Sequence, residues 1–303
     1  MRKALKWVGI IVGSIVGLLL IFLGISYVVS NSKLDASFEV PTETLSIPTD
    51  SASIAEGQYL ATAIGKCVDC HGSDFGGKAF VDEPAIGYVA GANLTTGKGG
   101  MASQLKTEDW VRAIRYGVGP DGQGLVVMPS EDYWHMSDEE LSKVIAYVQS
   151  LPAVDRDLPK PSLGLLGRVL VTIGALPLYG VEKIDLNASR PVPPPPGPTA
   201  EYGAHLAMIG GCKGCHREDL SGGPVSAGAP DWPPAANLTP HPDGLGSWSK
   251  EDFITALKQG KSKDGRALNP EAMPWTSTAL MTDQDIDAIW AYLQTVPAHE
   301  TGT

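Results

Sequence analysis

The feature that most constrains this chain is a five-residue motif, Cys-x-x-Cys-His, which occurs twice and contains every cysteine. It reads CVDCH at residues 67–71 and CKGCH at residues 212–216. The two copies leave no odd thiol, and a disulfide-stapled scaffold would use more cysteines in a shorter chain. We therefore expect the cysteines to act within their own motifs rather than to cross-link the fold.

The rest of the sequence repeats with nearly the same spacing. Asn93-Leu94-Thr95 recurs as Asn237-Leu238-Thr239, and Met128-Pro129 recurs as Met273-Pro274, in the same order relative to the motifs. Self-similarity at a fixed offset indicates duplicated structural units. We predict two copies of one domain of about 100 residues, which occupy residues 53–157 and 200–300 and are joined by an apolar, proline-rich linker, 158–199.

Each copy contains the same three expected helices. Apolar residues at three-four spacing, such as Leu141, Val144, Ile145 and Val148, are typical of an amphipathic helix, and Ser137 with Glu140 forms a capping box. Strand signals are scarce, so the predicted fold class is all-α. The expected helices span residues 55–65, 107–116 and 138–150 in the first copy and 200–209, 250–259 and 283–295 in the second.

The N-terminus predicts a membrane anchor. Residues 7–29 carry no charge, and this uncharged run is long enough to form a helix that crosses a hydrocarbon core of about 30 Å. Arg2, Lys3 and Lys6 precede it, so residues 1–6 are expected in the cytoplasm and the domains, after a linker at 30–52, on the periplasmic or extracytoplasmic side. A cleaved signal peptide is the alternative, although its apolar region is normally shorter. Both readings export the domains.

The linker contains two unusual segments. Residues 163–181 are apolar but interrupted by Arg168 and Pro177, and residues 191–198 read PVPPPPGP, which favours an extended spacer. The apolar segment is marginal in length for a second membrane span. We expect it to pack between the domains or against a partner subunit, since exposed apolar patches mark interfaces.

The motif itself predicts chemistry. Cys-x-x-Cys-His is the signature of c-type haem attachment, in which two thiols form thioethers with the haem vinyl groups and the next residue, histidine, binds the iron. A zinc site would need the two cysteine pairs much closer in sequence, and a redox disulfide would need a thioredoxin-like α/β pattern. We predict two covalently bound haem c groups, one held by Cys67, Cys70 and His71 and the other by Cys212, Cys215 and His216.

A second iron ligand is expected from a methionine in each copy. Met128 lies 57 residues after His71 and Met273 lies 57 residues after His216. Each precedes a proline, which disfavours helix and leaves the methionine in a loop that can reach across to the iron. Methionine opposite histidine is an established ligand pair of cytochromes c. Met136 and Met281 also repeat, but their position before the last helix favours a packing role.

Other repeated residues have weaker interpretations. His135 could bind iron, but Leu280 takes its place in the second copy, so a surface or haem-propionate contact is favoured. Arg115 and Lys258 occupy equivalent helical positions, where they would either pair with propionates or face solvent. The Asn-Leu-Thr sequences match the glycosylation sequon, but their repetition favours a loop that wraps the haem edge.

Both copies resemble a known domain. NLTPHPDGLGSWSKEDFITALKQGKSKDGRALNPEAMPWTSTALMTDQDIDAIWAYLQTVP in the second copy, and EDWVRAIRYGVGPDG and VVMPSEDYWHMSDEELSKVIAYVQSLP in the first, resemble the haem domains of cytochrome c subunits of membrane-bound alcohol and gluconate dehydrogenases. The resemblance covers nearly all of residues 53–300. It implies a class I cytochrome c fold with the eight haem-binding residues named above. Those subunits typically hold three haems, whereas this chain has two motifs.

These observations predict an electron carrier rather than an enzyme. Two irons that each have six ligands leave no open position for a substrate. The chain would therefore relay electrons between a dehydrogenase or quinol-oxidising complex and a terminal acceptor. A dihaem peroxidase would need one iron without its distal methionine, and a cytochrome c subunit of a haem-copper oxidase would differ only in its partner. The net charge of −11 argues against nucleic acid and suits a basic redox partner.

Overall fold

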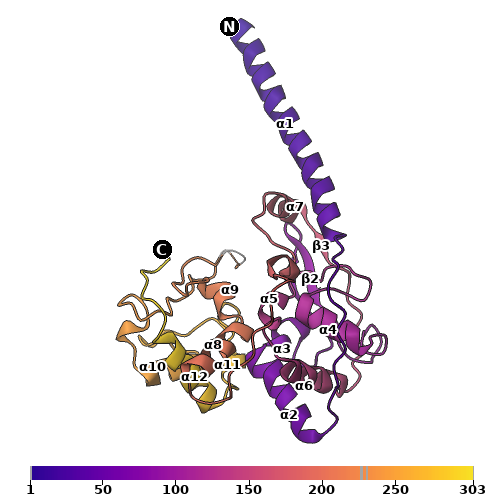
Figure 1. Ribbon diagram of the computed structural model, residues 1–303. Helices are drawn as coiled ribbons and strands as arrows, with labels where there is room; N and C mark the ends of the chain where they lie inside the picture. The colour runs from indigo at the N-terminus through magenta and orange to yellow at the C-terminus, as the bar shows by residue number, and fades with distance from the viewer. Residues whose placement is uncertain (1, 226–227, 230, 303) are drawn as a thin grey trace.

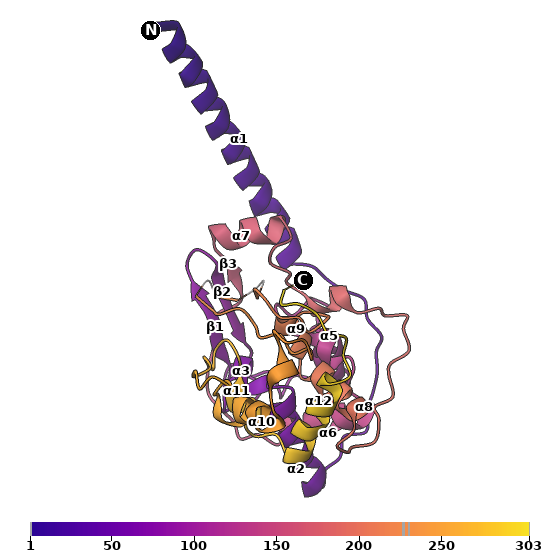
Figure 2. The same cartoon turned by 90° about the vertical axis from the view of Figure 1, so that its left-hand side faces the viewer.

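The computed structural model describes residues 2–225, 228–229 and 231–302, and it is mostly helical as predicted. One long helix, α1 (Arg2–Leu34), projects from a body with two lobes (Figure 1). Residues 51–150 build most of the first lobe and residues 200–302 build the second (Figures 1 and 2). The two lobes correspond to the two copies of the sequence repeat.

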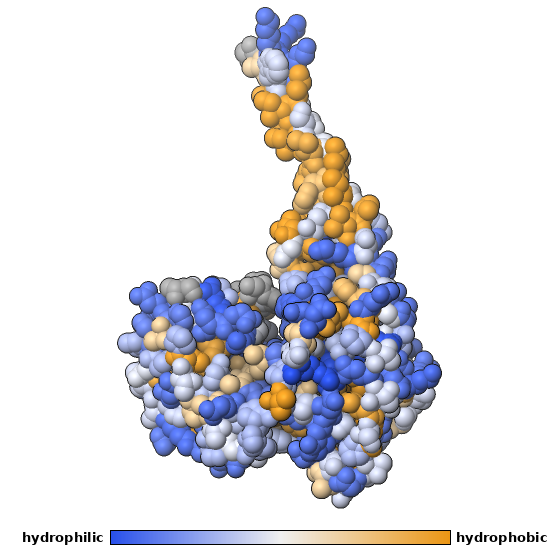
Figure 3. Space-filling model, viewed as in Figure 1, coloured by the Kyte–Doolittle hydropathy of each residue, from blue (hydrophilic) through white to orange (hydrophobic). Residues whose placement is uncertain are grey.

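The projecting helix is longer than the predicted span of 7–29 at both ends. Among the described residues, α1 is the one helix that is long and apolar enough to cross a membrane, a test that an N-terminal signal sequence also passes. Its apolar side chains are exposed along nearly all of its length (Figure 3). Only Ser26 and Ser30, close to its C-terminal end, are buried.

The first lobe has the three predicted helices and a short π-helical extension. The helix that precedes the motif is α2 (Ser51–Tyr59), and it continues as a π-helix, η1 (Leu60–Ile64). It crosses α6 so closely that a methyl group at Gly57 would lie 1.9 Å from the carbonyl oxygen of Lys143. The remaining helices are α3 (Cys67–His71), α4 (Thr107–Tyr116), α5 (Ser130–Tyr133) and α6 (Asp138–Gln149).

The second lobe repeats this arrangement. Helix α8 crosses α12, and a methyl group at Gly203 would lie 1.9 Å from the carbonyl oxygen of Ala288. The predicted helices are confirmed within two residues at their ends. The helices of this lobe are α8 (Ala200–Ile209), α9 (Cys212–His216), the 3-10 helix η3 (Leu245–Ser247), α10 (Lys250–Gln259), α11 (Trp275–Thr278) and α12 (Asp283–Leu293).

A small sheet in the first lobe was not predicted. Strands β1 (Lys78–Glu83) and β2 (Gly87–Gly91) form an antiparallel hairpin, and β3 (Ser162–Leu163) from the linker extends it in the order β1-β2-β3. The strands are short and contain glycine and alanine, which have low strand propensity. They are stabilised by partners distant in sequence, because Tyr88 of β2 pairs with Ser162 of β3.

Residues 163–181 do not lie between the lobes, which was one of the two expected placements, and the other, against a partner subunit, stays a prediction. They form β3, the eight-residue helix α7 (Leu165–Thr172) and a turn that leads to the 3-10 helix η2 (Gly180–Lys183). Val171 and Tyr179 are buried in a small core with residues of the first lobe and the end of α1. Helix α7 lies crosswise at the end of α1 (Figure 2).

The two lobes contact one another through equivalent elements. The Tyr59 hydroxyl of α2 donates to Asp285 at the start of α12. In the opposite direction, Nε2 of His205 on α8 lies 2.7 Å from Oε1 of Glu140 at the start of α6. Each lobe therefore places a polar side chain of its first helix on an acidic residue of the other lobe's last helix, an arrangement close to two-fold symmetric.

Candidate haem sites

Each Cys-x-x-Cys-His motif forms a single helical turn between two residues with left-handed backbone. The flanking residues are Lys66 (φ 52°) and Gly72 (φ 78°) in the first lobe and Gly211 (φ 64°) and Arg217 (φ 70°) in the second. Left-handed backbone costs a non-glycine residue about 1–2 kcal/mol. The backbone thus turns sharply before the first cysteine and after the histidine, so the motif stands apart from the helix that leads into it.

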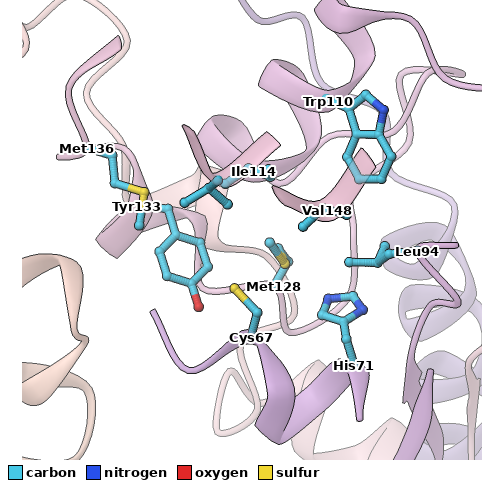
Figure 4. Close-up of a pocket in the computed structure, with 10 residues that line it drawn as sticks. Cys67, His71, Leu94, Trp110, Ile114, Met128, Tyr133, Met136 and Val148 are labelled. Carbon is cyan, nitrogen blue, oxygen red and sulfur yellow. The ribbon is translucent and has the colours of Figure 1, made fainter. Parts of the chain in front are cut away.

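The first lobe has a cavity beside its motif. Its volume is about 30 Å³. Figure 4 shows the Cys67 sulfur, the His71 ring and the Met128 sulfur directed toward this space. The structure therefore brings three of the four residues predicted for the first haem together at one cavity. The other lining residues are Leu94, Trp110, Ile114, Tyr133, Met136, Val144 and Val148.

Both motif histidines are held in one orientation by a backbone carbonyl. Nδ1 of His71 lies 2.8 Å from the Ala92 oxygen, and Nδ1 of His216 lies 2.7 Å from the Ala236 oxygen. Such a bond requires the proton on Nδ1 and leaves the Nε2 lone pair available to a metal. Burial lowers the pKa of both histidines, which favours the neutral, metal-binding imidazole.

The four cysteines are unpaired and partly buried. Burial raises the pKa of Cys67 to about 12 and that of Cys70 to about 11, and it also raises the pKa of Cys212 and of Cys215. All four are therefore neutral thiols at neutral pH. A haem c would take up each of these thiols as a thioether, with sulfur on one vinyl carbon and hydrogen on the other.

The two candidate methionine ligands lie in matching turns. The Ser130 N–H donates to the Met128 oxygen at 2.8 Å, and the Trp275 N–H donates to the Met273 oxygen at 2.7 Å. Both methionines are partly exposed and pack against the core from loops. Met136 and Met281, the rival pair, are 2% and 5% exposed and belong to the core itself. Met136 also reaches the first cavity, so its side chain is the natural control for Met128.

A haem fits the residues around the first cavity. The wall is apolar apart from the candidate ligands and one hydroxyl, as a porphyrin requires. Nε1 of Trp110 is buried and has no acceptor in the described part of the chain, and Figure 4 shows it on the side of the indole that faces away from Cys67, His71 and Met128. Strand β2 packs against the backbone of the motif, because a methyl group at Gly91 would lie 2.2 Å from the Cys70 oxygen. Sequence reasoning did not recognise Trp110 as a residue that lines the cavity.

Arg115 does not face solvent, which was one of its two expected placements, because its side chain is fully buried. It does not line the first cavity, and a contact with a haem propionate stays a prediction. It forms ion pairs with Glu43 and with Asp138 (2.9 Å) and donates to the Met136 oxygen at 3.3 Å. Burial alone would raise the pKa of Glu43, but the Tyr116 hydroxyl and the charges of Arg115 and Arg190 outweigh it and lower that pKa. Arg115 therefore fastens the segment after α1 to the first lobe.

The repeated Asn-Leu-Thr segments close each lobe. Nδ2 of Asn93 donates to the Val154 oxygen, and Nδ2 of Asn237 donates to the His299 oxygen, both at 2.7 Å. Each asparagine thus holds the chain that follows the last helix of its lobe. Leu94 lines the first cavity, which agrees with the expected loop beside the haem. His135 does not line that cavity, and its ring packs against Trp134 instead.

Comparison with known families agrees with this geometry. A family model described as "Cytochrome c" matches residues 200–297, and one described as "Cytochrome C oxidase, cbb3-type, subunit III" matches residues 52–148. The chain holds two cytochrome c domains in tandem. Two such domains account for two covalent haem c groups, one in each lobe.

Relatives of this dihaem cytochrome c include subunits of dehydrogenases. It is 29% identical over 284 residues to the fructose dehydrogenase cytochrome subunit of Gluconobacter japonicus, covering 85% of this chain and 55% of the relative. It is 29% identical over 282 residues to the gluconate 2-dehydrogenase cytochrome c subunit of Pantoea cypripedii, covering 83% and 61%. A protein named diheme cytochrome c-type from Cereibacter sphaeroides is 33% identical over 108 residues, covering 32% and 36%.

The resemblance to dehydrogenase cytochrome subunits is thereby confirmed. The cytochrome spans only 55–61% of the length of the two long-matching relatives. Their haem domains are therefore the shared part, and what their names say of sugars and acids belongs to those proteins.

Proposed function

We propose that this cytochrome relays electrons between a redox enzyme and a terminal acceptor, and that it is not itself a catalyst. The observation that carries the proposal is the set of candidate iron ligands that each domain offers. Each domain offers one oriented, neutral histidine and one loop methionine, and together they would occupy both axial positions of an iron. An iron with both positions filled exchanges electrons but binds no substrate.

The roles of the protein side chains follow from this donor set. Haem supplies the one-electron couple. Cys67, Cys70 and His71 hold it in the first domain, and Cys212, Cys215 and His216 in the second. Met128 and Met273 complete the irons, and thioether ligation stabilises the reduced state and raises the potential. The apolar wall around the first cavity excludes water from one face of the ring.

Contacts between the motifs of the two domains favour transfer within the chain. Ser277 of α11 donates to Asp69 of the first motif at 3.2 Å. Lys66, which precedes that motif, donates to the Gly210 oxygen just before the second motif. Both haem-bearing turns therefore lie at the junction of the lobes, where one domain can pass an electron to the other.

The partner and the membrane location complete the proposal. The names of the relatives favour a membrane-bound dehydrogenase as electron donor. Helix α1 would cross the cytoplasmic membrane once, with Arg2, Lys3 and Lys6 on the inner side and the haem domains outside. The match of residues 52–148 to an oxidase-subunit family favours a second candidate, a cytochrome subunit of a haem-copper oxidase. Co-purification from native membranes distinguishes the two partners.

The test is a spectroelectrochemical titration of the full chain with methionine variants. Met128→Leu and Met273→Leu should each remove one half of the far-red absorption of methionine–iron(III) ligation and lower one of the two potentials. Met136→Leu and Met281→Leu are the matched controls and should leave both unchanged. A wild-type protein with one high-spin iron would contradict the relay and favour the dihaem peroxidase instead.

A further inference from the structure

Helix α7 has an exposed apolar face that has no role in the proposed electron relay. Leu165, Leu166 and Ile173 are 61%, 47% and 60% exposed, and Val169 and Leu170 on the same face are partly exposed. The opposite face is buried through Gly167 and Val171. Residues 163–181 contain no acid, and Arg168 is their only charge. A short helix with an apolar outer face and a basic flank is the pattern of a helix that lies in a membrane interface.

Helix α7 is fixed to α1 at one level. The Arg168 guanidinium lies 4.4 Å from the centre of the Tyr27 ring and donates to Ser30 Oγ at 2.8 Å and to Asn31 Oδ1 at 2.7 Å. Thr172 donates to the Ser26 oxygen at 3.4 Å. These contacts explain why Ser26 and Ser30 are the buried residues of α1. The apolar surface of α1 continues down to this level (Figure 3).

That level coincides with the outer boundary of a bilayer. A hydrocarbon core of about 30 Å corresponds to roughly 20 helical residues. Counted from Trp7, where the uncharged run begins, it ends near Tyr27, the residue beneath Arg168. A tyrosine and an arginine at this depth are typical interfacial residues. Because α7 crosses α1 there (Figure 2), its exposed leucines are at the depth of the headgroups and the first methylene groups.

The β1–β2 hairpin supports α7 at its N-terminal half. The Gly164 N–H donates to the Ile86 oxygen at 2.9 Å, and the Leu166 N–H donates to the Ala85 oxygen at 2.9 Å. A methyl group at Gly167 would lie 1.9 Å from the Ile86 oxygen. The turn of the hairpin thus holds α7 at its N-terminal half, while α1 holds it at Arg168 and Thr172. The helix cannot tilt away from either without breaking these bonds.

We propose that α7 lies flat in the outer leaflet and fixes the orientation of the first haem domain on the lipid surface. The partner is the bilayer itself, and the inference rests on the proposed span of α1. Leu165, Leu166 and Ile173 insert among the acyl chains, and Arg168 stays bound to α1 at the level of the headgroups. The haem domain then has one fixed orientation relative to the membrane rather than swinging on a tether.

Spin labels on the reduced holoprotein test this inference. The four native cysteines are consumed by haem, so Leu165→Cys and Ile173→Cys each give one reactive thiol at an exposed position. Leu280→Cys is the matched control, since Leu280 is 59% exposed in the second domain, and Leu18→Cys reports on α1. The proteins are reconstituted in vesicles of phosphatidylethanolamine and phosphatidylglycerol, and the accessibility of each label to oxygen is compared with its accessibility to a water-soluble nickel complex.

We expect the oxygen-to-nickel accessibility ratio to be highest at position 18. At positions 165 and 173 the ratio should be equal, and severalfold above the ratio at position 280. A ratio at 165 and 173 equal to that at 280 would overturn the inference while the anchor stands. Labels at 165 and 173 that are shielded from both reagents would also overturn it, in favour of a protein partner on α7. A low ratio at position 18 would instead refute the proposed membrane span.

Discussion

The contact between the first and last helices of each domain gives the sharpest quantitative test of the fold. In Gly203→Ala, the new methyl group would lie 1.9 Å from the Ala288 oxygen. An ordinary contact begins near 3.4 Å, so α8 must move about 1.5 Å away from α12. Alanine gains about 1 kcal/mol of helix propensity, whereas overpacking of this kind costs about 1–3 kcal/mol or more. Because the obstacle is backbone rather than a flexible side chain, overpacking should dominate.

We expect Gly203→Ala to lower the free energy of unfolding of the second domain by about 2 kcal/mol, which corresponds to a fall in Tm of roughly 8–16 °C for a domain of this size. The assay is thermal unfolding of the oxidised full chain, followed by far-ultraviolet circular dichroism and by the far-red methionine–iron band. Half of the far-red band should be lost at the lower temperature at which the second domain unfolds. Gly57→Ala should have the same effect on the first domain, because its methyl group would lie 1.9 Å from the Lys143 oxygen.

Gly197→Ala is the control for these variants. Its methyl group would meet only a Thr199 carbon at 3.9 Å, in the linker, so the Tm should stay unchanged. Helix propensity alone would predict that Gly203→Ala unfolds at the wild-type temperature or above it. That result would show that α8 and α12 are not in contact through this glycine, and it would refute the reasoning.

Three further predictions concern buried charges and the junction of the domains. Arg115→Ala should cost about 2–4 kcal/mol of stability in denaturant unfolding, because it empties a fully buried site and removes the pairs with Glu43 and Asp138. Lys258→Ala, which breaks an exposed pair with Asp283, should cost less than about 1 kcal/mol; equal costs would contradict the burial of Arg115. Burial and the neighbouring Glu131 raise the pKa of Asp132 from 3.8 to about 7, so the folded state holds more protons between these values, and stability should fall as the pH rises through this window. Asp132→Asn should remove that dependence when unfolding is measured at several pH values, and an unchanged slope would assign it to another group. Tyr59→Phe should weaken the junction by about 1–3 kcal/mol, since it deprives Asp285 of its donor, and the domains should then unfold in more widely separated transitions; Tyr202→Phe, whose hydroxyl donates no hydrogen bond in the described part of the chain, should have no such effect.

The helices could be predicted closely because their end signals are local. Helix α10 begins after a capping box between Ser249 and Asp252 and ends at Gly260, whose φ of 61° stops the helix. Helix α4 likewise ends at Gly117, with φ 65°. The candidate haem ligands stay a prediction, which rests on a tight motif that contains three of them and on the duplicated spacing that singles out the methionine.

The features that sequence reasoning missed all depend on partners distant in the chain. Arg115 reads as a helix-surface residue until Glu43, 72 residues earlier, covers it. The hairpin has weak strand propensity and is extended by β3 from the linker. The apolar segment is expected from sequence to lie between the domains or against a partner subunit, because nothing in its own residues indicates that it packs on Ser26 and Ser30 of α1. In each case the structure depends on a contacting residue elsewhere in the chain, which the segment's own sequence does not reveal.

The junction of the domains shows what the duplication contributes to the function. Oε2 of Glu140 accepts from the Ser137 N–H of its own helix at 2.8 Å, while Oε1 faces His205 of the other domain. Asp285, at the equivalent position, accepts from Tyr59 in return. The same two surfaces therefore meet in both directions, as in an isologous dimer, and this symmetry brings the two haem-bearing turns to one junction. Helices α1 and α7 break the symmetry, and both pack on the first domain. In the proposed function, the symmetric junction would serve exchange between the haems, and α1 with α7 would serve their placement at the membrane.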